Sequence, residues 1–405
     1  MHQALGDSWY LAGEFRKASE AYTAARELAA SDHLLDAGLL LKLSHVEQKL
    51  GHCENALRWA EQGRTILKGL DGMEAARQAA RSGAWYAIVL QREGRTAEAL
   101  EWAERTVAEA EAVDDAEALA DAYYVMGWGH GQLGKEGGLT FMQRSLEAYQ
   151  RSGNMVRQAG VLSSLGVVCQ WAGRWDEALS YYERGRKEAS KIGSRVVAAT
   201  ASINIAEILT DRGEWAEAEA ILLETLPLWK ASQYRLYLGA CLLVLGRVSL
   251  RLGRLEEALS RLEEAKSNFL QVGAEQEVPP VEARIAECHV AMGNVDAALT
   301  LTGGMLSRAS ESNGVARVVP LVGRVQAHAL LLQGDPWGAR DALEASLAAA
   351  RERQDLFELT LTSLSLIELD RLEGVEPPLE MVTESRSLLS SLKVRAVPPV
   401  PLPAR

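Results

Sequence analysis

The chain has 405 residues, with 43 Lys and Arg against 55 Asp and Glu, so its formal net charge is −12. With 48% apolar and 24% charged residues, it has the composition of a chain that folds around a core rather than that of a disordered one. The negative charge disfavours general binding to the phosphate backbone of nucleic acids. We therefore expect a folded protein with no direct nucleic-acid partner.

Helix-forming residues dominate the chain. Ala, Leu, Glu and Arg are abundant, Pro and Phe number only 11 and 4, and β-branched residues do not alternate along the sequence. The longest apolar run, 236–246, is too short to span a bilayer, and residues 1–10 lack the basic start and apolar core of a secretory signal. The four cysteines are too widely spaced for a metal or redox motif. We predict an all-α cytoplasmic protein with buried thiols and no membrane partner.

A glycine recurs at intervals of 38 to 43 residues from the N-terminus onward, which indicates an internal repeat. The nine glycines are Gly13, Gly51, Gly94, Gly134, Gly173, Gly213, Gly253, Gly293 and Gly334. Five residues after the glycine stands Ala in eight of the nine repeats, with Leu139 as the exception, and seven residues before it stands Gly, Ala or Ser in all nine. A glycine turn between two closely packed antiparallel helices explains this pattern.

Each repeat is thus predicted to be a helical hairpin. Its first helix carries an apolar stripe of 3.6-residue period, as in Val161, Leu165 and Val168. Because one hairpin cannot cover its own stripe, neighbouring hairpins must stack to bury it. We predict an α-solenoid in which residues 1–373 form the repeat array.

The last part of the chain departs from the repeat pattern. A tenth turn falls at Gly374, but Ile367 and Leu379 replace the small residues and Pro377–Pro378 precede the second helix. We interpret 374–392 as the degenerate helix that caps the last hairpin. The proline-rich residues 393–405, called the tail below, cannot be helical and are predicted to be extended.

These residues resemble the tetratricopeptide repeat family, in which Leu-Gly is followed by Gly-x-aromatic-x-x-Ala and then an aromatic residue. Leu165-Gly166 with Gly173, Trp175, Ala178 and Tyr182 is one of the two best copies, and Leu5-Gly6 with Gly13 to Tyr22 is the other. The period of about 40 residues exceeds the usual ~34, and the family's Pro after the second helix is missing. The resemblance implies a right-handed α-solenoid of about ten antiparallel hairpins. It also implies that Trp175 and Trp215 are core residues.

In the resembling family, defined positions on the first helix of each repeat face a concave groove that holds a protein or peptide. In repeats four to seven these positions are Tyr124, Trp128, Gln132, Ser163, Gln170, Trp171, Glu207, Asp211, Arg247 and Arg251, and Asn204 stands where such arrays often carry Asn. Arg92, Glu287, Arg324 and His328 occupy similar positions in other repeats. These residues are our candidate ligand groove.

Two alternatives remain open within this set. Trp128 and Trp171 either line the groove or pack against the neighbouring first helix, because a repeat position predicts the face but not the depth of a side chain. The acids Glu207 and Asp211 with the adjacent arginines form either solvated ion pairs or a polar ligand site.

No motif nominates a catalytic group. Residues 129–135 have the glycine spacing of a nucleotide-binding loop, but no strand precedes them and Glu136 stands where a phosphate-binding loop needs Ser or Thr. The seven His residues are scattered over several repeat positions. We therefore expect no enzyme activity, no cofactor and no metal from this chain.

The two ends suggest a wider context. Gly13 leaves only twelve residues for a first helix, so we expect that the chain is cut from something longer. The tail is similar to the ends of bacterial signalling proteins in which a class III nucleotide cyclase and a P-loop regulatory ATPase precede a tetratricopeptide array. We expect a regulatory binding module whose partners include a protein, a peptide or its own upstream domains. The alternatives are a free-standing adaptor and the effector-binding array of a transcription regulator.

Overall fold

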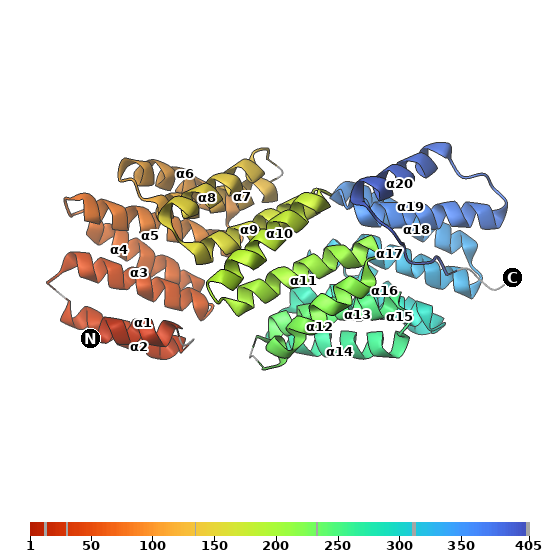
Figure 1. Cartoon of the computed structure of the whole chain (residues 1–405), viewed down its shortest axis with the longest axis horizontal. Helices are drawn as coiled ribbons and strands as arrows, with labels where there is room; N and C mark the ends of the chain where they lie inside the picture. Colours follow the sequence, from red (N-terminus) through yellow and green to blue (C-terminus); the bar gives the residue numbers. More distant parts are fainter. Residues whose placement is uncertain (12–13, 30, 134, 232–233, 310–312, 402–405) are drawn as a thin grey trace. The chain divides into compact units, whose positions relative to one another are not determined.

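The computed structural model describes residues 1–11, 14–29, 31–133, 135–231, 234–309 and 313–401. Every regular element in these ranges is a helix, and successive helices run antiparallel as hairpins (Figure 1). The predicted all-α solenoid is therefore confirmed. The chain divides into two compact units, unit 1 (Met1–Val168) and unit 2 (Cys169–Arg405), within the stretch that the repeat pattern treats as one array.

The first helix of each hairpin has an odd number and the second an even number. Unit 1 and the boundary helix comprise α1 (His2–Leu11), α2 (Phe15–Leu28), α3 (His33–Lys49), α4 (Cys53–Leu67), α5 (Met73–Arg92), α6 (Thr96–Ala112), α7 (Ala116–Gln132), α8 (Gly138–Ser152) and α9 (Met155–Trp171). Unit 2 continues with α10 (Trp175–Lys191), α11 (Arg195–Arg212), α12 (Trp215–Ala231), α13 (Arg235–Arg251), α14 (Leu255–Gln271), the 3-10 turn η1 (Glu275–Glu277), α15 (Val278–Ala291), α16 (Val295–Leu306), α17 (Asn313–Gln333), α18 (Pro336–Arg353), α19 (Leu356–Glu373) and α20 (Leu379–Leu392).

The repeat glycines lie in turns that require a positive φ, as the sequence predicts. Seven of the nine repeat glycines, and Gly374 of the tenth turn, have φ between 70° and 87°, a region that costs little only for glycine. Gly13 and Gly134 lie outside the described residues. The Ala five positions later is at most 1% exposed in all eight repeats that carry it. Leu139, the exception, is half-buried.

The small residue seven positions before the turn is required by close packing. A Cβ atom on Gly6 would lie 2.5 Å from the ring of Tyr22, the aromatic residue of the same repeat. A Cβ on Gly246 would lie 2.7 Å from Leu262 in the same way. The second helix therefore places a large side chain directly on the backbone of the first, which fixes the pairing within each hairpin.

Aspartates start several first helices. The side chains of Asp32, Asp115 and Asp355 each accept a hydrogen bond from the backbone N–H three residues later, at 2.9 to 3.0 Å. These bonds satisfy amide groups that have no partner within the helix. Of the two tryptophans expected in the core, Trp175 is 6% exposed, whereas Trp215 is half-buried and donates to the carbonyl of Thr210.

Helix α17 contains the one stretch of the described chain, 314–333, that is long and apolar enough to cross a membrane. Two thirds of this stretch is buried in the fold, and it carries the buried Arg324. Burial in a helical core explains its composition. At the C-terminal end, α20 is followed by non-helical residues 393–401, and 402–405 lie outside the described residues.

Candidate functional site

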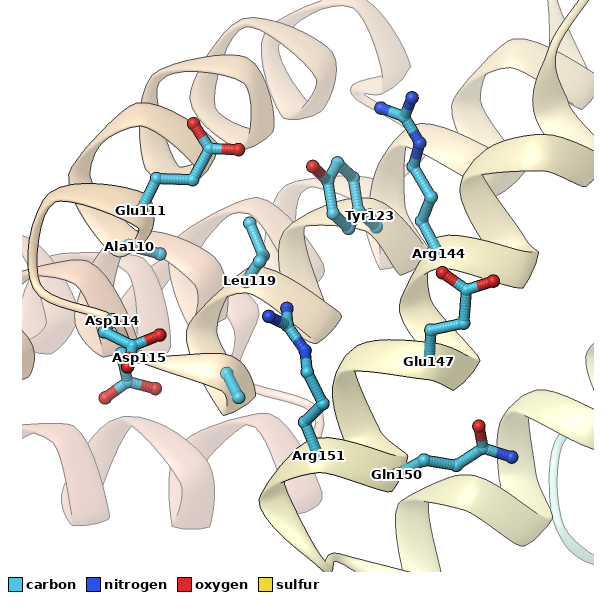
Figure 2. Close-up of a pocket in the computed structure, with 11 residues that line it drawn as sticks. Ala110, Glu111, Asp114, Asp115, Leu119, Tyr123, Arg144, Glu147, Gln150 and Arg151 are labelled. Carbon is cyan, nitrogen blue, oxygen red and sulfur yellow. The ribbon is translucent and has the colours of Figure 1, made fainter.

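A surface cavity of about 830 Å³ lies in unit 1, between the second helices α6 and α8. Figure 2 shows Glu111 and Asp114 on one wall and Arg144 and Arg151 on the other. The Arg144 guanidinium lies over the Tyr123 ring, 5.7 Å from its centroid. None of the cavity's residues belongs to the predicted groove, because the cavity is lined by α6, α8 and positions of α7 that the groove register does not include.

A smaller cavity of about 260 Å³ lies at the first repeats of unit 1, lined by Asp7, Tyr10, Tyr22, Lys42 and His45. The Asp7 carboxylate accepts hydrogen bonds from the Tyr22 hydroxyl at 2.7 Å and from Lys42 at 2.5 Å. Burial raises the pKa of Asp7, but these two bonds outweigh it and hold the pKa below its ordinary value. Asp7 therefore stays charged and neutralises Lys42.

Further cations gather beside this cavity from three first helices. Burial, together with the charges of Arg157, Lys42, Lys49 and Arg92, lowers the pKa of His45 to about 3. Burial and the charges of Arg92 and Arg157 also lower the pKa of Lys49. All four cations therefore act on His45 through their charge. We call Lys42, Lys49, Arg92 and Arg157 the cationic cluster.

The carboxylates near the cationic cluster do not balance it. Arg157 lies 3.9 Å from Asp121, which also accepts a hydrogen bond from Tyr149, and Lys42 is paired with Asp7. In the described part of the chain, no carboxylate lies within ion-pair distance of Lys49 or Arg92. An acidic protein thus carries a local excess of positive charge on the first helices of unit 1.

Residues of the cationic cluster were mostly missed by the sequence prediction. Arg92 was included, but the other residues of the predicted groove lie in repeats four to nine. Tyr10, His45 and Lys49 stand three, six and two residues before their turn glycines, which are positions of the same register. Applying that register to the first two repeats finds these three residues, whereas Arg157 lies outside it.

The predicted groove residues of unit 1 do not line either cavity. The rings of Tyr124 and Trp128 are half-buried and pack edge to face, with centroids 6.5 Å apart. Ser163 bonds to its own helix through the Ala159 carbonyl. Gln132 is exposed and accepts a hydrogen bond from Thr96 at 2.8 Å.

In unit 2, the first predicted acid–base group is centred on a buried arginine. Arg247, 6% exposed, donates to Glu207 at 3.2 Å and also to Asp211. Burial raises the pKa of Asp211 to about 6, although Arg247 opposes this shift. These residues form neutralising pairs between α11 and α13, as one of the two alternatives predicted, but the arginine is buried rather than solvated.

Arg251 pairs instead with the next repeat. It donates to Glu287 of α15 at 2.9 Å, and Arg284 donates to the other oxygen of the same carboxylate at 2.8 Å. Glu358 of α19 accepts from Arg324 at 2.9 Å and lies 3.8 Å from Arg284. The side chains of these five residues are at most 10% exposed.

The charges of this second cluster also set the pKa values of its neighbours. Burial raises the pKa of Glu287, yet Arg251, Arg284 and Arg324 together hold it well below its ordinary value. Burial, reinforced by Arg324, lowers the pKa of His328 to about 3. The His328 ring nitrogen Nε2 lies 2.9 Å from the Ser365 hydroxyl. This cluster has three arginines and two carboxylates, but with Arg247, Glu207 and Asp211 the count becomes four of each, which leaves little free charge for a ligand.

The remaining predicted residues are dispersed. Gln170 is half-buried and accepts a hydrogen bond from the core Tyr182 at 2.9 Å. Trp171 is 68% exposed, and Asn204 is half-buried. Within the described ranges no group of three His, Cys, Asp or Glu side chains is placed to hold a metal ion.

Known proteins share this fold and parts of this sequence. A comparison with curated proteins finds no match. Among solved structures, the chain is similar to a Rap protein complexed with Competence and Sporulation Factor, with a TM-score of 0.65, 14% identity and coverage of 89% of this chain and 99% of that one. It is also similar to the apo form of RapI, with a TM-score of 0.61, 13% identity and coverage of 88% and 97%.

The apo form of the quorum sensor NprR from B. thuringiensis is a third similar structure, with a TM-score of 0.59, 13% identity and coverage of 85% and 97%. At these identities the likeness shows the fold alone. Models of the tetratricopeptide repeat match residues 74–105, 161–189 and 196–271. These matches show tetratricopeptide repeats in both units of the chain, and the turn and packing register described above has the same form in the repeats between and beyond them.

Proposed function

We propose that the chain is a non-catalytic regulatory module that binds a peptide or protein segment on the first helices of unit 1, with an acidic group of the ligand at the cationic cluster. The observation that carries this proposal is the excess of positive charge formed by Lys49, Arg92 and Arg157 beside the Tyr10 and His45 rings. A carboxylate placed there would relieve the repulsion among the cations. Aromatic and Arg side chains are also the residue types that contribute most to binding.

The 260 Å³ cavity supports the choice of this surface. Its Tyr10 and His45 side chains are half-buried, so an apolar side chain of the ligand can contact them while its acidic group meets the cations. In the described part of unit 2, the buried arginines are paired with carboxylates instead. The Rap protein complexed with Competence and Sporulation Factor shows that the same fold can hold a signalling factor.

For the wider context, we propose that the module is the sensory or recruitment region of a bacterial, cytoplasmic signalling protein. The similarity of the tail to the ends of cyclase and ATPase signalling proteins supports this proposal. The coding sequence upstream of codon 1 tests it. An open frame for a P-loop ATPase or a cyclase supports it, and a stop codon instead supports a free-standing adaptor.

Binding is tested with a panel of labelled peptides that carry either a free C-terminal carboxylate, internal acidic residues or neither, measured by fluorescence polarisation. We expect the acidic peptides to bind and the amidated, uncharged ones to bind weakly. Arg92→Ala should then weaken binding by roughly 10-fold or more, because one charge-assisted contact is lost. Arg16→Ala on α2 removes an equally exposed positive charge elsewhere in unit 1 and is the matched control. Equal binding by the Arg92 variant and by the wild type would overturn the proposal.

A further inference from the structure

The chain returns to the start of unit 2 after its last helix. Beyond α20, the tail meets the end of α11 (Figure 1), which lies 180 residues earlier in the sequence. The backbone N–H of Arg395 donates to the Arg212 carbonyl at 2.8 Å, and the Arg212 side chain donates through Nε to the Leu392 carbonyl at 3.0 Å. Arg212 thus binds the main chain on both sides of Lys393 and Val394, once through its own carbonyl oxygen and once through its side chain.

Two carboxylates form ion pairs with side chains of the same segment. Lys393 lies 2.8 Å from Asp176 at the start of α10, and Arg395 lies 3.3 Å from Glu214 in the α11–α12 turn. Asp176 also accepts from Arg212 at 2.8 Å. The hydrogen bonds from Lys393 and Arg212 hold the pKa of Asp176 below its ordinary value, so the carboxylate is charged at neutral pH.

Gly213 provides the space for this contact. A Cβ atom on Gly213 would lie 2.7 Å from the backbone nitrogen of Ala396 and 2.8 Å from its Cβ. No side chain can fit between the turn and the tail at that distance. The site therefore combines a bare backbone position, a main-chain donor–acceptor pair and two carboxylates that lie opposite cations two residues apart.

The contact is specific but weakly held. The side chains of Lys393 and Arg395 are 62% and 74% exposed, and ion pairs at such exposure contribute little and weaken with salt. Leu392 is the one fully buried anchor and belongs to the end of α20. The tail keeps its place because it is covalently attached and so acts at a high effective concentration.

We propose that Asp176, Arg212, Gly213 and Glu214 form a binding site for a Lys-x-Arg segment, and that the chain's own tail occupies this site and can leave it. The site is separate from the cationic cluster and does not depend on the function proposed above. Its ligand class is a basic peptide, bound here with Lys393 in the left-handed conformation that ends α20. In this chain that ligand is residues 393–396.

A matched pair of glycine variants of the full chain tests the proposal. Gly213 and Gly253 have similar φ values, 82° and 74°, but a Cβ on Gly253 would meet nothing within 4 Å. Both substitutions by Ala carry the same backbone strain, and only Gly213→Ala displaces the tail. We expect the amide of Arg395 to exchange with deuterium several-fold faster in Gly213→Ala than in Gly253→Ala. Equal exchange in the two variants overturns the docking.

Recognition and exchange are tested separately. Glu214→Arg should release the tail, and the double variant Glu214→Arg with Arg395→Glu should restore slow exchange of the tail amides. A synthetic peptide of residues 391–401 at millimolar concentration should speed exchange of the Arg395 amide in the wild-type chain, whereas the same peptide with both cations replaced by Glu should not. No rescue by the double variant, or no effect of the peptide, shows a fixed structural contact and overturns the proposal.

Discussion

His328 makes the stability of unit 2 depend on pH in a calculable way. Its imidazole is 5% exposed, and burial with the nearby Arg324 lowers its pKa to about 3 in the folded protein, against about 6.5 in an unfolded chain. Because the folded pKa is the lower one, the contribution of His328 to stability is complete above pH 6.5. It is lost as the pH falls from 6.5 toward 3.

The size of this effect follows from the two pKa values. At pH 5 the unfolded imidazole is protonated and the folded one is not. Each pH step below 6.5 lowers the free energy of unfolding by about 1.4 kcal/mol, so the loss between pH 7 and pH 5 is about 2 kcal/mol. His45 titrates in the same direction, so the wild-type profile alone cannot isolate His328.

The assay therefore compares variants rather than pH values alone. His328→Gln keeps a partner for Ser365 but cannot titrate, so urea unfolding at pH 7 and pH 5, followed by tryptophan fluorescence, should show a pH dependence smaller than wild type by about 2 kcal/mol. His33→Gln, at an exposed histidine, should leave the pH dependence unchanged. If the His328 variant loses as much stability as wild type on acidification, the buried neutral imidazole is refuted.

Three further predictions concern packing and charge. Glu358→Gln leaves Arg324 buried without its main carboxylate and should lower the free energy of unfolding, measured in urea, by about 3–5 kcal/mol. Glu368→Gln breaks an exposed pair on the same helix and should lower it by less than about 1 kcal/mol. Similar losses in the two variants would show that burial of the pair does not matter. Ala178→Trp should overpack the hairpin, lower the free energy of unfolding by about 1–3 kcal/mol or more and so lower the melting temperature. An unchanged melting temperature would contradict the repeat register. Trp171→Ala should change stability by less than about 1 kcal/mol because the ring is 68% exposed, so a loss near the ~3–5 kcal/mol typical of a buried Trp would mean that the ring is packed.

The hairpin architecture could be predicted from the sequence because its causes are local. Gly213 and Ala218 stand five residues apart in one turn and helix. The positive φ recurs at the seven repeat glycines that the structure describes, and the close packing recurs in the eight repeats that carry the Ala. For the candidate site, the sequence predicted only on which face of its helix a residue lies. Whether Trp171 is exposed depends on what packs around it, and the repeat register carries no information about that depth.

The repeat pattern does not determine which carboxylate each arginine pairs with. Arg247 and Arg251 stand on one helix near the same acids, yet Arg247 pairs backward with α11 and Arg251 forward with Glu287 of α15. The docking of the tail on Arg212 joins residues 180 positions apart. No periodicity connects such positions, so only the folded structure brings them together.

The ion pairs of unit 2 restrict how this protein can change in length. Repeat arrays commonly gain or lose a hairpin, because each hairpin contacts only its neighbours. Here Arg284 of α15 reaches past α17 to within 3.8 Å of Glu358 on α19. Deleting or duplicating any hairpin between α13 and α19 would leave a buried cation or carboxylate without its partner. Lineages of this protein should therefore vary in repeat number outside this stretch, while the hairpins within it are inherited as one block.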